Sequence, residues 1–324
     1  MSSNVGNKIK KMFGTREIIL IFVLVICSIG VSLFSPVFLS TTNLLSIIMS
    51  VTVQGTIAIG MVMLLACGEM DLSVGYTMAF TGVIVGLLMK SGVPIVLAIV
   101  IALLAAVLIG YVNGFLVAKI GLNSFITTLG MSCALQGLML VFSNGTSVTG
   151  LPAAFKTVGQ GRLFGIQYPI YVLIVLVIVG DVLFRNARHM RQIYYVGSNT
   201  KAAKLNGINV SKVKIMCFLI TSVCAGIAGI LITARFGSSS VTIGSDTAMD
   251  VITACIIGGA SLNGGKGSVL GAVLGVTFLS VLSTALNLLG INIYWQNFAT
   301  GAILIIAIFI DAMGERRKAV RKAI

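Results

Sequence analysis

The sequence predicts an all-α, polytopic membrane protein with about ten transmembrane helices and with both termini in the cytoplasm. Of its 324 residues, 57% are hydrophobic and only 9% are charged, and the mean hydropathy is +1.09. Soluble proteins carry about 25% charged residues, so this composition excludes a soluble fold. Apolar runs extend from residue 18 to residue 310 without a long hydrophilic block, which favours a single transmembrane domain over residues 1–324.

The candidate spans follow from the length of each apolar run and from the residues that interrupt it. A transmembrane helix needs about 20 apolar residues, and Gly, Pro, Asn and charged residues mark the breaks. The first run follows basic residues, as in a signal peptide, but it is long and many further spans come after it, so we expect a retained helix. In order, the spans are 18–38, 44–66, 72–89, 93–118, 124–143, 169–184, 213–233, 248–260, 267–285 and 291–310.

Basic residues gather in three clusters at the ends of these spans and in the loop between two of them. The positive-inside pattern places such clusters in the cytoplasm, and an even number of spans, six of them before the central loop, agrees with that placement. The net charge of +14 is therefore interpreted as membrane orientation and not as nucleic-acid binding. The connections 144–168 and 237–247 then lie outside, where they can receive a partner. The three clusters are Lys8, Lys10, Lys11 and Arg16; Arg185, Arg188, Arg191, Lys201, Lys204, Lys212 and Lys214; and Arg316, Arg317, Lys318, Arg321 and Lys322.

Two glycine-rich segments, 68–75 and 258–267, interrupt the apolar runs. In a bilayer, such backbone is tolerated only where it is buried in protein or lines a wet cavity, and the sequence leaves open whether the segments are intramembrane breaks or cytoplasmic loops. The second segment resembles a phosphate-binding loop, but a Walker A motif ending at Lys266 would need Gly in place of Ala260 and Ser or Thr in place of Gly267. We therefore do not expect this chain to hydrolyse ATP.

Residues for catalysis or metal binding are scarce. His189 is the single histidine, and no Ser/His/Asp set can be built on it. The six cysteines lie within or at the ends of apolar runs without a CxxC pair, which is typical of small buried hydrophobic residues. We expect a protein that is not an enzyme and that carries no cofactor or metal of its own.

Three carboxylates within the apolar part of the chain are more informative. Ionisable groups at membrane depth are costly and usually face a bundle interior or a pathway. Asp71 also precedes an apolar run, where a helix N-terminus would stabilise it, so a purely structural role stays open. The candidate translocation path consists of Glu69, Asp71, Ser73, Asn113, Asn123 and Asp250.

Four motifs occur along the chain in a specific order and spacing. They are Asp71-Leu-Ser-Val-Gly75, Lys201-Ala-Ala-Lys-Leu-Asn-Gly-Ile-Asn209, Gly258-Gly-Ala-Ser-Leu-x-Gly-Gly-Lys-Gly267 and Leu286-Asn-Leu-Leu-Gly290. Over nearly the whole chain, they resemble the permeases of bacterial ATP-binding cassette importers for ribose and related monosaccharides. The resemblance implies a multi-pass subunit of the bacterial plasma (inner) membrane that forms the translocation path for such a sugar.

The resemblance also implies a coupling element in the central loop, about residues 185–214. Permeases of this superfamily carry the pattern Glu-Ala-Ala-x3-Gly, whose short helix docks on the ATPase subunit. Ala202 and Ala203 have high helix propensity, and Gly207 can end the helix at a left-handed C-cap. Lys201 stands where the pattern has Glu, and Glu69 stands where relatives commonly have Gly. The candidate coupling residues are Lys201, Ala202, Ala203, Lys204 and Gly207.

The partners are likewise implied by the resemblance. They are an ATP-binding cassette ATPase subunit, which carries the ATP and Mg, an extracytoplasmic sugar-binding protein, and a second permease, either an identical copy or a similar chain. The sequence leaves the sugar open, because the binding protein largely selects it. The alternative function is an ion-coupled secondary transporter of a small polar solute, which the broken glycine-rich segments and Asp71 would also suit.

Overall fold

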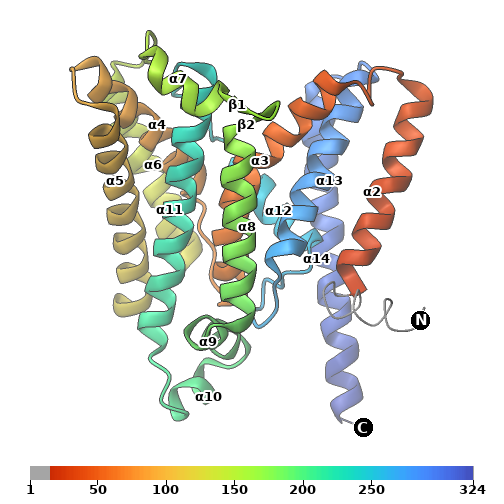
Figure 1. The fold of residues 1–324 in the computed structure, drawn as a ribbon. Coiled ribbons are helices and arrows are strands. Elements are labelled where there is room, and N and C mark those ends of the chain that lie inside the picture. The colour runs from red at the N-terminus through yellow and green to blue at the C-terminus, as the bar shows by residue number, and fades with distance from the viewer. Residues whose placement is uncertain (1–14, 324) are drawn as a thin grey trace.

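The computed structural model describes residues 15–323, and helices account for most of them (Figure 1). Within this part of the chain, eight helical segments are long and apolar enough to cross a membrane. This confirms the predicted all-α, polytopic class. The segments are α2 (Thr15–Phe34), α3 (Thr41–Ala66), α5 (Ile95–Phe115) with its π-helical continuation η1 (Leu116–Ile120), α6 (Ser124–Ser143), α8 (Tyr168–Asn186), α11 (Val210–Phe236), α13 (Val269–Leu288) and α14 (Ile293–Ala323).

The other two predicted spans form shorter helices. They are α4 (Val74–Lys90), with 17 residues, and α12 (Thr247–Ile257), with 11 residues. At a rise of 1.5 Å per residue, α12 is only about 16 Å long, against about 30 Å for the hydrocarbon core of a bilayer. The two glycine-rich segments break the helices as predicted, since α3 ends before the first segment and α12 ends before the second.

Helices α3 and α11 form the centre of the bundle. Of an apolar stretch of 18 residues in α3, 83% is buried inside the bundle, whereas only 6% of the corresponding stretch in α14 is buried. Helix α11 packs along α3, α4 and α5. Small residues permit this approach, because a Cβ added at Gly110 would lie 2.8 Å from the carbonyl oxygen of Phe218, and one added at Gly114 would lie 2.9 Å from the Cα of Ile215. Close approach of helix backbones at small residues is a usual way to pack helices in membranes.

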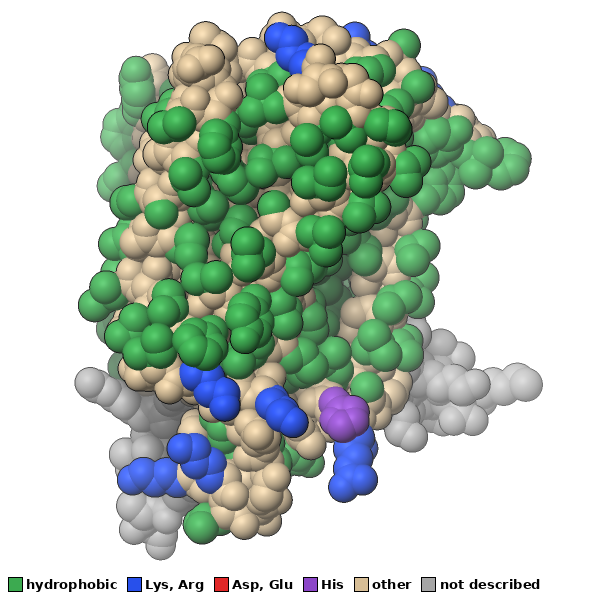
Figure 2. Space-filling model, turned by 90° about the vertical axis from the view of Figure 1, so that its left-hand side faces the viewer, with side chains coloured by type: hydrophobic (Ala, Val, Ile, Leu, Met, Phe, Trp, Pro, Cys, Tyr) green, Lys and Arg blue, Asp and Glu red, His purple; other side chains and the backbone are tan. Residues whose placement is uncertain are grey.

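The two ends of the bundle differ. One end carries α7 (Ala153–Gln160) and a small hairpin of β1 (Arg162–Leu163) and β2 (Ile166–Gln167), both within the connection that was predicted to lie outside. The opposite end carries α9 (Arg188–Ser198) and α10 (Thr200–Leu205), as well as the start of α2 and the end of α14 (Figure 1). Figure 2 shows a broad band of hydrophobic side chains between these ends, with Lys, Arg and His side chains beyond it.

Candidate functional site

Four of the predicted coupling residues lie in α10, a helix of six residues with caps at both ends, and the fifth, Gly207, follows it. The Asn199 side chain accepts a hydrogen bond from the Ala202 backbone N–H at 3.0 Å. At the other end, the backbone N–H of Gly207 donates to the backbone carbonyl of Lys204 at 3.0 Å. Gly207 has a φ of +77°, in the left-handed region. The predicted left-handed cap at Gly207 is therefore present. Because a helix this short is marginal alone, these caps are what define its ends.

The cap that starts the next helix follows immediately. The Asn209 side chain accepts from the Lys212 backbone N–H at 3.0 Å, and α11 begins at Val210. The connection from α10 to α11 thus consists of residues 206–209. A short, capped connection therefore joins α10 to the central helix of the bundle.

The surface of α10 is suited to contact with another protein. Ala203 is buried, Ala202 is exposed, and the Leu205 side chain is 90% exposed. A hollow of about 430 Å³ adjoins the helix, between α9 and α10. No acidic residue occurs between Asp181 and Asp246, so the surrounding charge is basic. Tyr195, Ser198, Asn199, Ala202, Ala203, Asn206 and Ile208 line the hollow.

Three of the candidate path residues form one fully buried polar network at the start of α4. Asp71 Oδ1 accepts from the Ser73 backbone N–H at 2.7 Å and from the Ser73 hydroxyl at 2.5 Å. The Asn113 amide of α5 donates to Ser73 Oγ at 3.0 Å and to Asp71 Oδ2 at 3.4 Å. Asp71 does not cap α4 directly, because Ser73 is the N-cap residue. The carboxylate instead holds the turn that leads into the helix.

Helix α6 holds the same turn from the other side. The Leu72 N–H donates to Thr128 Oγ1 at 3.0 Å, and the Ser132 hydroxyl donates to the Leu72 carbonyl at 2.9 Å. Protein side chains thus satisfy the backbone groups of Leu72 and the Ser73 N–H in the first glycine-rich segment.

The remaining candidate path residues lie apart from this network. Glu69 forms a partly buried ion pair with Lys214 of α11. Asp250 of α12 accepts from the Gln54 amide of α3 at 3.4 Å. Asn123 is exposed and caps α6, where its side chain accepts from a backbone N–H. The sequence analysis missed the partners Lys214 and Gln54, since no local pattern marks them.

The starts of the two short helices meet inside the bundle. Gly75, in the first turn of α4, lies against Gly244, which precedes α12, so closely that a Cβ on either residue would overlap the carbonyl oxygen of the other. Gly244 has φ of +113°, which side chains rarely adopt. Two helix N-termini, with their positive dipole ends, are therefore brought to the same region.

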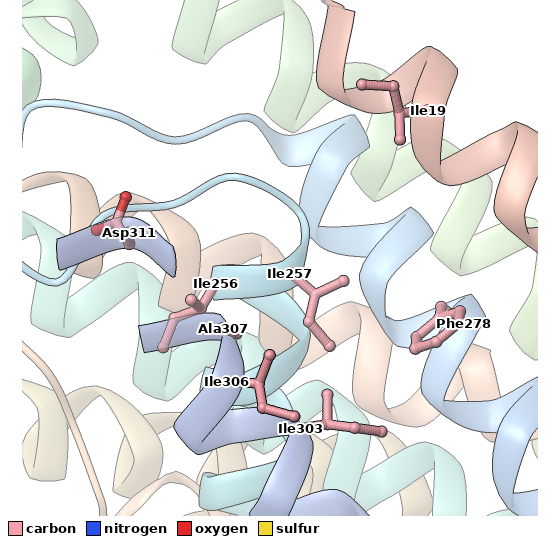
Figure 3. Close-up of a pocket in the computed structure, with 8 residues that line it drawn as sticks. All are labelled: Ile19, Ile256, Ile257, Phe278, Ile303, Ile306, Ala307 and Asp311. Atoms are coloured by element: carbon pink, nitrogen blue, oxygen red, sulfur yellow. The ribbon is translucent and has the colours of Figure 1, made fainter. Parts of the chain in front are cut away.

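An apolar pocket of about 430 Å³ lies between α2, α12, α13 and α14 (Figure 3). None of the candidate path residues lines it. Its one carboxylate, Asp311, accepts a hydrogen bond at 2.9 Å from Ser261 in the second glycine-rich segment. Among the side chains that the structure describes, no group of three or more His, Cys, Asp or Glu is placed to hold a metal ion. The lining residues are Ile19, Ile256, Ile257, Phe278, Ile303, Ile306, Ala307 and Asp311.

The bundle, its internal helix breaks and the short capped helix at one end define a multi-pass membrane permease. The family described as "branched-chain amino acid transport system / permease component" matches residues 43–308, and this chain belongs to that family. The resemblance inferred from the four motifs is thereby confirmed, and the chain is a multi-pass protein of the bacterial inner membrane.

Several sugar-transport permeases match the chain over most of its length. The ribose import permease of Haemophilus influenzae is 34% identical over 285 residues, which cover 87% of this chain and 88% of the relative. The L-arabinose transporter permease of Azospirillum brasilense is 34% identical and covers 93% of this chain and 88% of its own length. The xylose transport permease of Haemophilus influenzae is 30% identical, with 86% and 91% covered. No solved structure gives a significant match.

Proposed function

We propose that this chain forms the membrane path of an ATP-binding cassette importer for a monosaccharide such as ribose, arabinose or xylose, while a separate subunit hydrolyses ATP. An extracytoplasmic binding protein delivers the sugar to the end that carries α7 and the hairpin. The relatives named above support the class of cargo. The observation that carries the proposal is α10, a short, capped, basic helix that presents an exposed leucine next to a hollow.

In this proposal, the end with α9 and α10 faces the cytoplasm and docks on the ATPase. Lys201 and Lys204 are exposed on α10, and Arg188, Arg191 and Lys212 are exposed nearby. Because Lys201 stands where the usual coupling pattern has Glu, complementary charge favours an acidic surface on the ATPase. Leu205 supplies an apolar anchor within this basic surface. Interfaces commonly place such an anchor inside a polar rim.

The proposed sugar path passes the region where the starts of α4 and α12 meet. Asp71, Ser73 and Asn113 are fully buried and hydrogen-bonded to one another, so in this closed arrangement they position α4 and would be uncovered only by movement of the helices. Asp250 is half-buried in the first turn of α12, where it accepts a hydrogen bond from the Gln54 amide of α3. A second permease, identical or similar, completes the path in this proposal, because such importers enclose it between two permease subunits.

The test is sugar uptake by the purified importer in proteoliposomes. The vesicles contain the permease with its ATPase, and they receive labelled ribose, arabinose or xylose with the binding protein outside. Uptake of one sugar that requires both internal ATP and the binding protein is the expected result. Uptake without ATP that a proton ionophore abolishes would contradict the proposal and would favour the ion-coupled transporter.

A further inference from the structure

The second glycine-rich segment packs against the last turn of α9, directly before α10. Gly197 of α9 is held between the end of α3 and this segment. A Cβ at Gly197 would overlap the carbonyl oxygen of Ala66 and would lie 2.7 Å from the backbone nitrogen of Gly265. The two neighbours are themselves joined, because the Gly265 N–H donates to the Ala66 carbonyl at 2.8 Å.

The glycines of the segment are required by this contact. Gly264 and Gly265 have φ of +81° and +74°, which side chains rarely adopt. A Cβ at Gly264 would lie 2.9 Å from the Cα of Gly197, and one at Gly265 would meet Ser198. Three backbones, from α3, α9 and the connection between α12 and α13, therefore approach one another without side chains between them. We call Ala66, Gly197, Gly264 and Gly265 the glycine clasp.

A side-chain contact reinforces the glycine clasp. The Tyr194 hydroxyl of α9 donates to the Gly267 carbonyl at 2.9 Å, and its ring stacks on Phe184 of α8 with centroids 4.6 Å apart. Burial raises the pKa of Tyr194 to about 12, so the phenol stays protonated at physiological pH and keeps its donor. A Cβ at Gly267 would in turn lie 3.0 Å from Val62 of α3.

The connection from the clasp to α10 is stiff. Asn199 is at once the C-cap residue of α9 and the N-cap residue of α10. The Thr200 hydroxyl at the start of α10 donates to the Val196 carbonyl of α9 at 2.9 Å. Helix α10 therefore cannot move far without carrying the last turn of α9 with it.

The clasp reaches both helix breaks. On the α3 side, the chain continues from Ala66 into Glu69, which pairs with Lys214 of α11, and then into the buried Asp71 network. On the other side, Ser261 of the same segment donates to Asp311 of α14 at 2.9 Å. The contact at Gly197 thus joins the end of α3, which leads into the first glycine-rich segment, to the second glycine-rich segment.

We propose that the glycine clasp transmits the movement of α10 to both helix breaks, and that Gly197 is a positioning residue for transport. This role rests on the proposed function, since it needs an ATPase that moves α10. It assigns a purpose to the glycine-rich motif at 258–267: its glycines let the backbone close around α9. ATP hydrolysis without the clasp would move α10 but leave the breaks in place.

The test measures sugar transported per ATP hydrolysed by the assembled complex in proteoliposomes. We expect Gly197→Ala to keep assembly and ATPase activity near wild type and to lower the transport ratio by about tenfold, within the usual range of coupling between sites. Gly137→Ala is the matched control, because a Cβ there meets nothing within 4 Å, and its ratio should equal that of wild type.

Tyr194→Phe tests the same idea with a milder change. It removes only the hydroxyl that binds Gly267, and we expect the transport ratio to fall about threefold, as loss of one hydrogen bond allows. This variant decides the question if Gly197→Ala does not assemble. The glycine clasp would be contradicted if Tyr194→Phe kept the wild-type transport ratio and Gly197→Ala either kept it too or failed to assemble. Normal ATP-driven uptake by the wild type would still support the proposed function in that case.

Discussion

At the residue scale, the partly buried charges of Glu69 and Lys214 pair across a large distance in the sequence. Glu69 and Lys214 are 145 residues apart, and their side chains are 11% and 21% exposed in the ion pair. Breaking a buried pair is costly, because it leaves one charge without compensation. This pair ties the first helix break to the base of α11, just beyond the coupling element.

A double-mutant cycle tests this ion pair. We expect Glu69→Gln and Lys214→Met each to lower the free energy of unfolding by about 1–3 kcal/mol. In the double variant, we expect the free energy of unfolding to fall by less than the sum of the two single effects. The reason is that each single change leaves the other charge partly buried and unpaired. Thermal unfolding in detergent measures the effect.

The control cycle uses Asp181 and Arg185 on α8, whose side chains are 17% and 37% exposed in an i, i+4 pair. We expect a coupling energy of only about 0.3–0.5 kcal/mol there. Equal coupling energies for the two pairs would contradict the special role of Glu69.

Asp71 provides a second test at this scale. Asp71→Ala removes the acceptor of the Ser73 N–H and hydroxyl, both buried, so we expect the free energy of unfolding to fall by about 1–3 kcal/mol for each unsatisfied group. Asp246→Ala is the control, because Asp246 is exposed and its side chain caps no backbone N–H. The same loss in both variants would show that the buried network does not hold α4.

At the element scale, α10 is defined by its caps rather than by its length. Six residues give too few hydrogen bonds for a stable isolated helix. Gly207 ends it in the left-handed conformation, and its N–H donates to Lys204. The length and end of α10 are therefore sensitive to a single residue.

Gly207→Pro should uncouple ATP hydrolysis from transport while membrane insertion stays normal. Proline fixes φ near −65° and has no N–H, whereas Gly207 has φ of +77° and donates to Lys204. Gly207→Asn is the matched control, since Asn tolerates the left-handed region and should keep most of the transport. ATPase activity and sugar uptake, measured in the same vesicles, provide the comparison; normal uptake by Gly207→Pro would remove α10 from the mechanism.

At the scale of the whole molecule, local features were predictable and long-range contacts were not. The apolar runs predicted the helices, because hydropathy depends on neighbouring residues. The cap at Gly207 was predictable for the same reason. The contact between Gly197 and Gly265 was not, since it depends on how α9 meets a connection more than sixty residues later. Helix α12 came out shorter than its apolar run because the chain turns at Gly258 and Gly259.

Two exposed helices indicate where the molecule meets its surroundings. Only 11% of the apolar stretch of α2 and 6% of that of α14 is buried, in contrast to 83% for α3. Such surfaces suit lipid or a second permease. The proposed docking of α10 on an ATPase concerns a different surface, at the end of the bundle that carries α9 and α10.

Co-purification tests this proposed docking most directly. The tagged chain is extracted gently from its native membrane, and the proteins that accompany it are identified by mass spectrometry, with Leu205→Asp purified in parallel. We expect an ATP-binding cassette subunit to accompany the wild type and to be depleted with Leu205→Asp, because a charge would replace the exposed apolar anchor. A wild-type chain that purifies without any ATPase, yet still transports sugar in vesicles lacking ATP, would contradict the account.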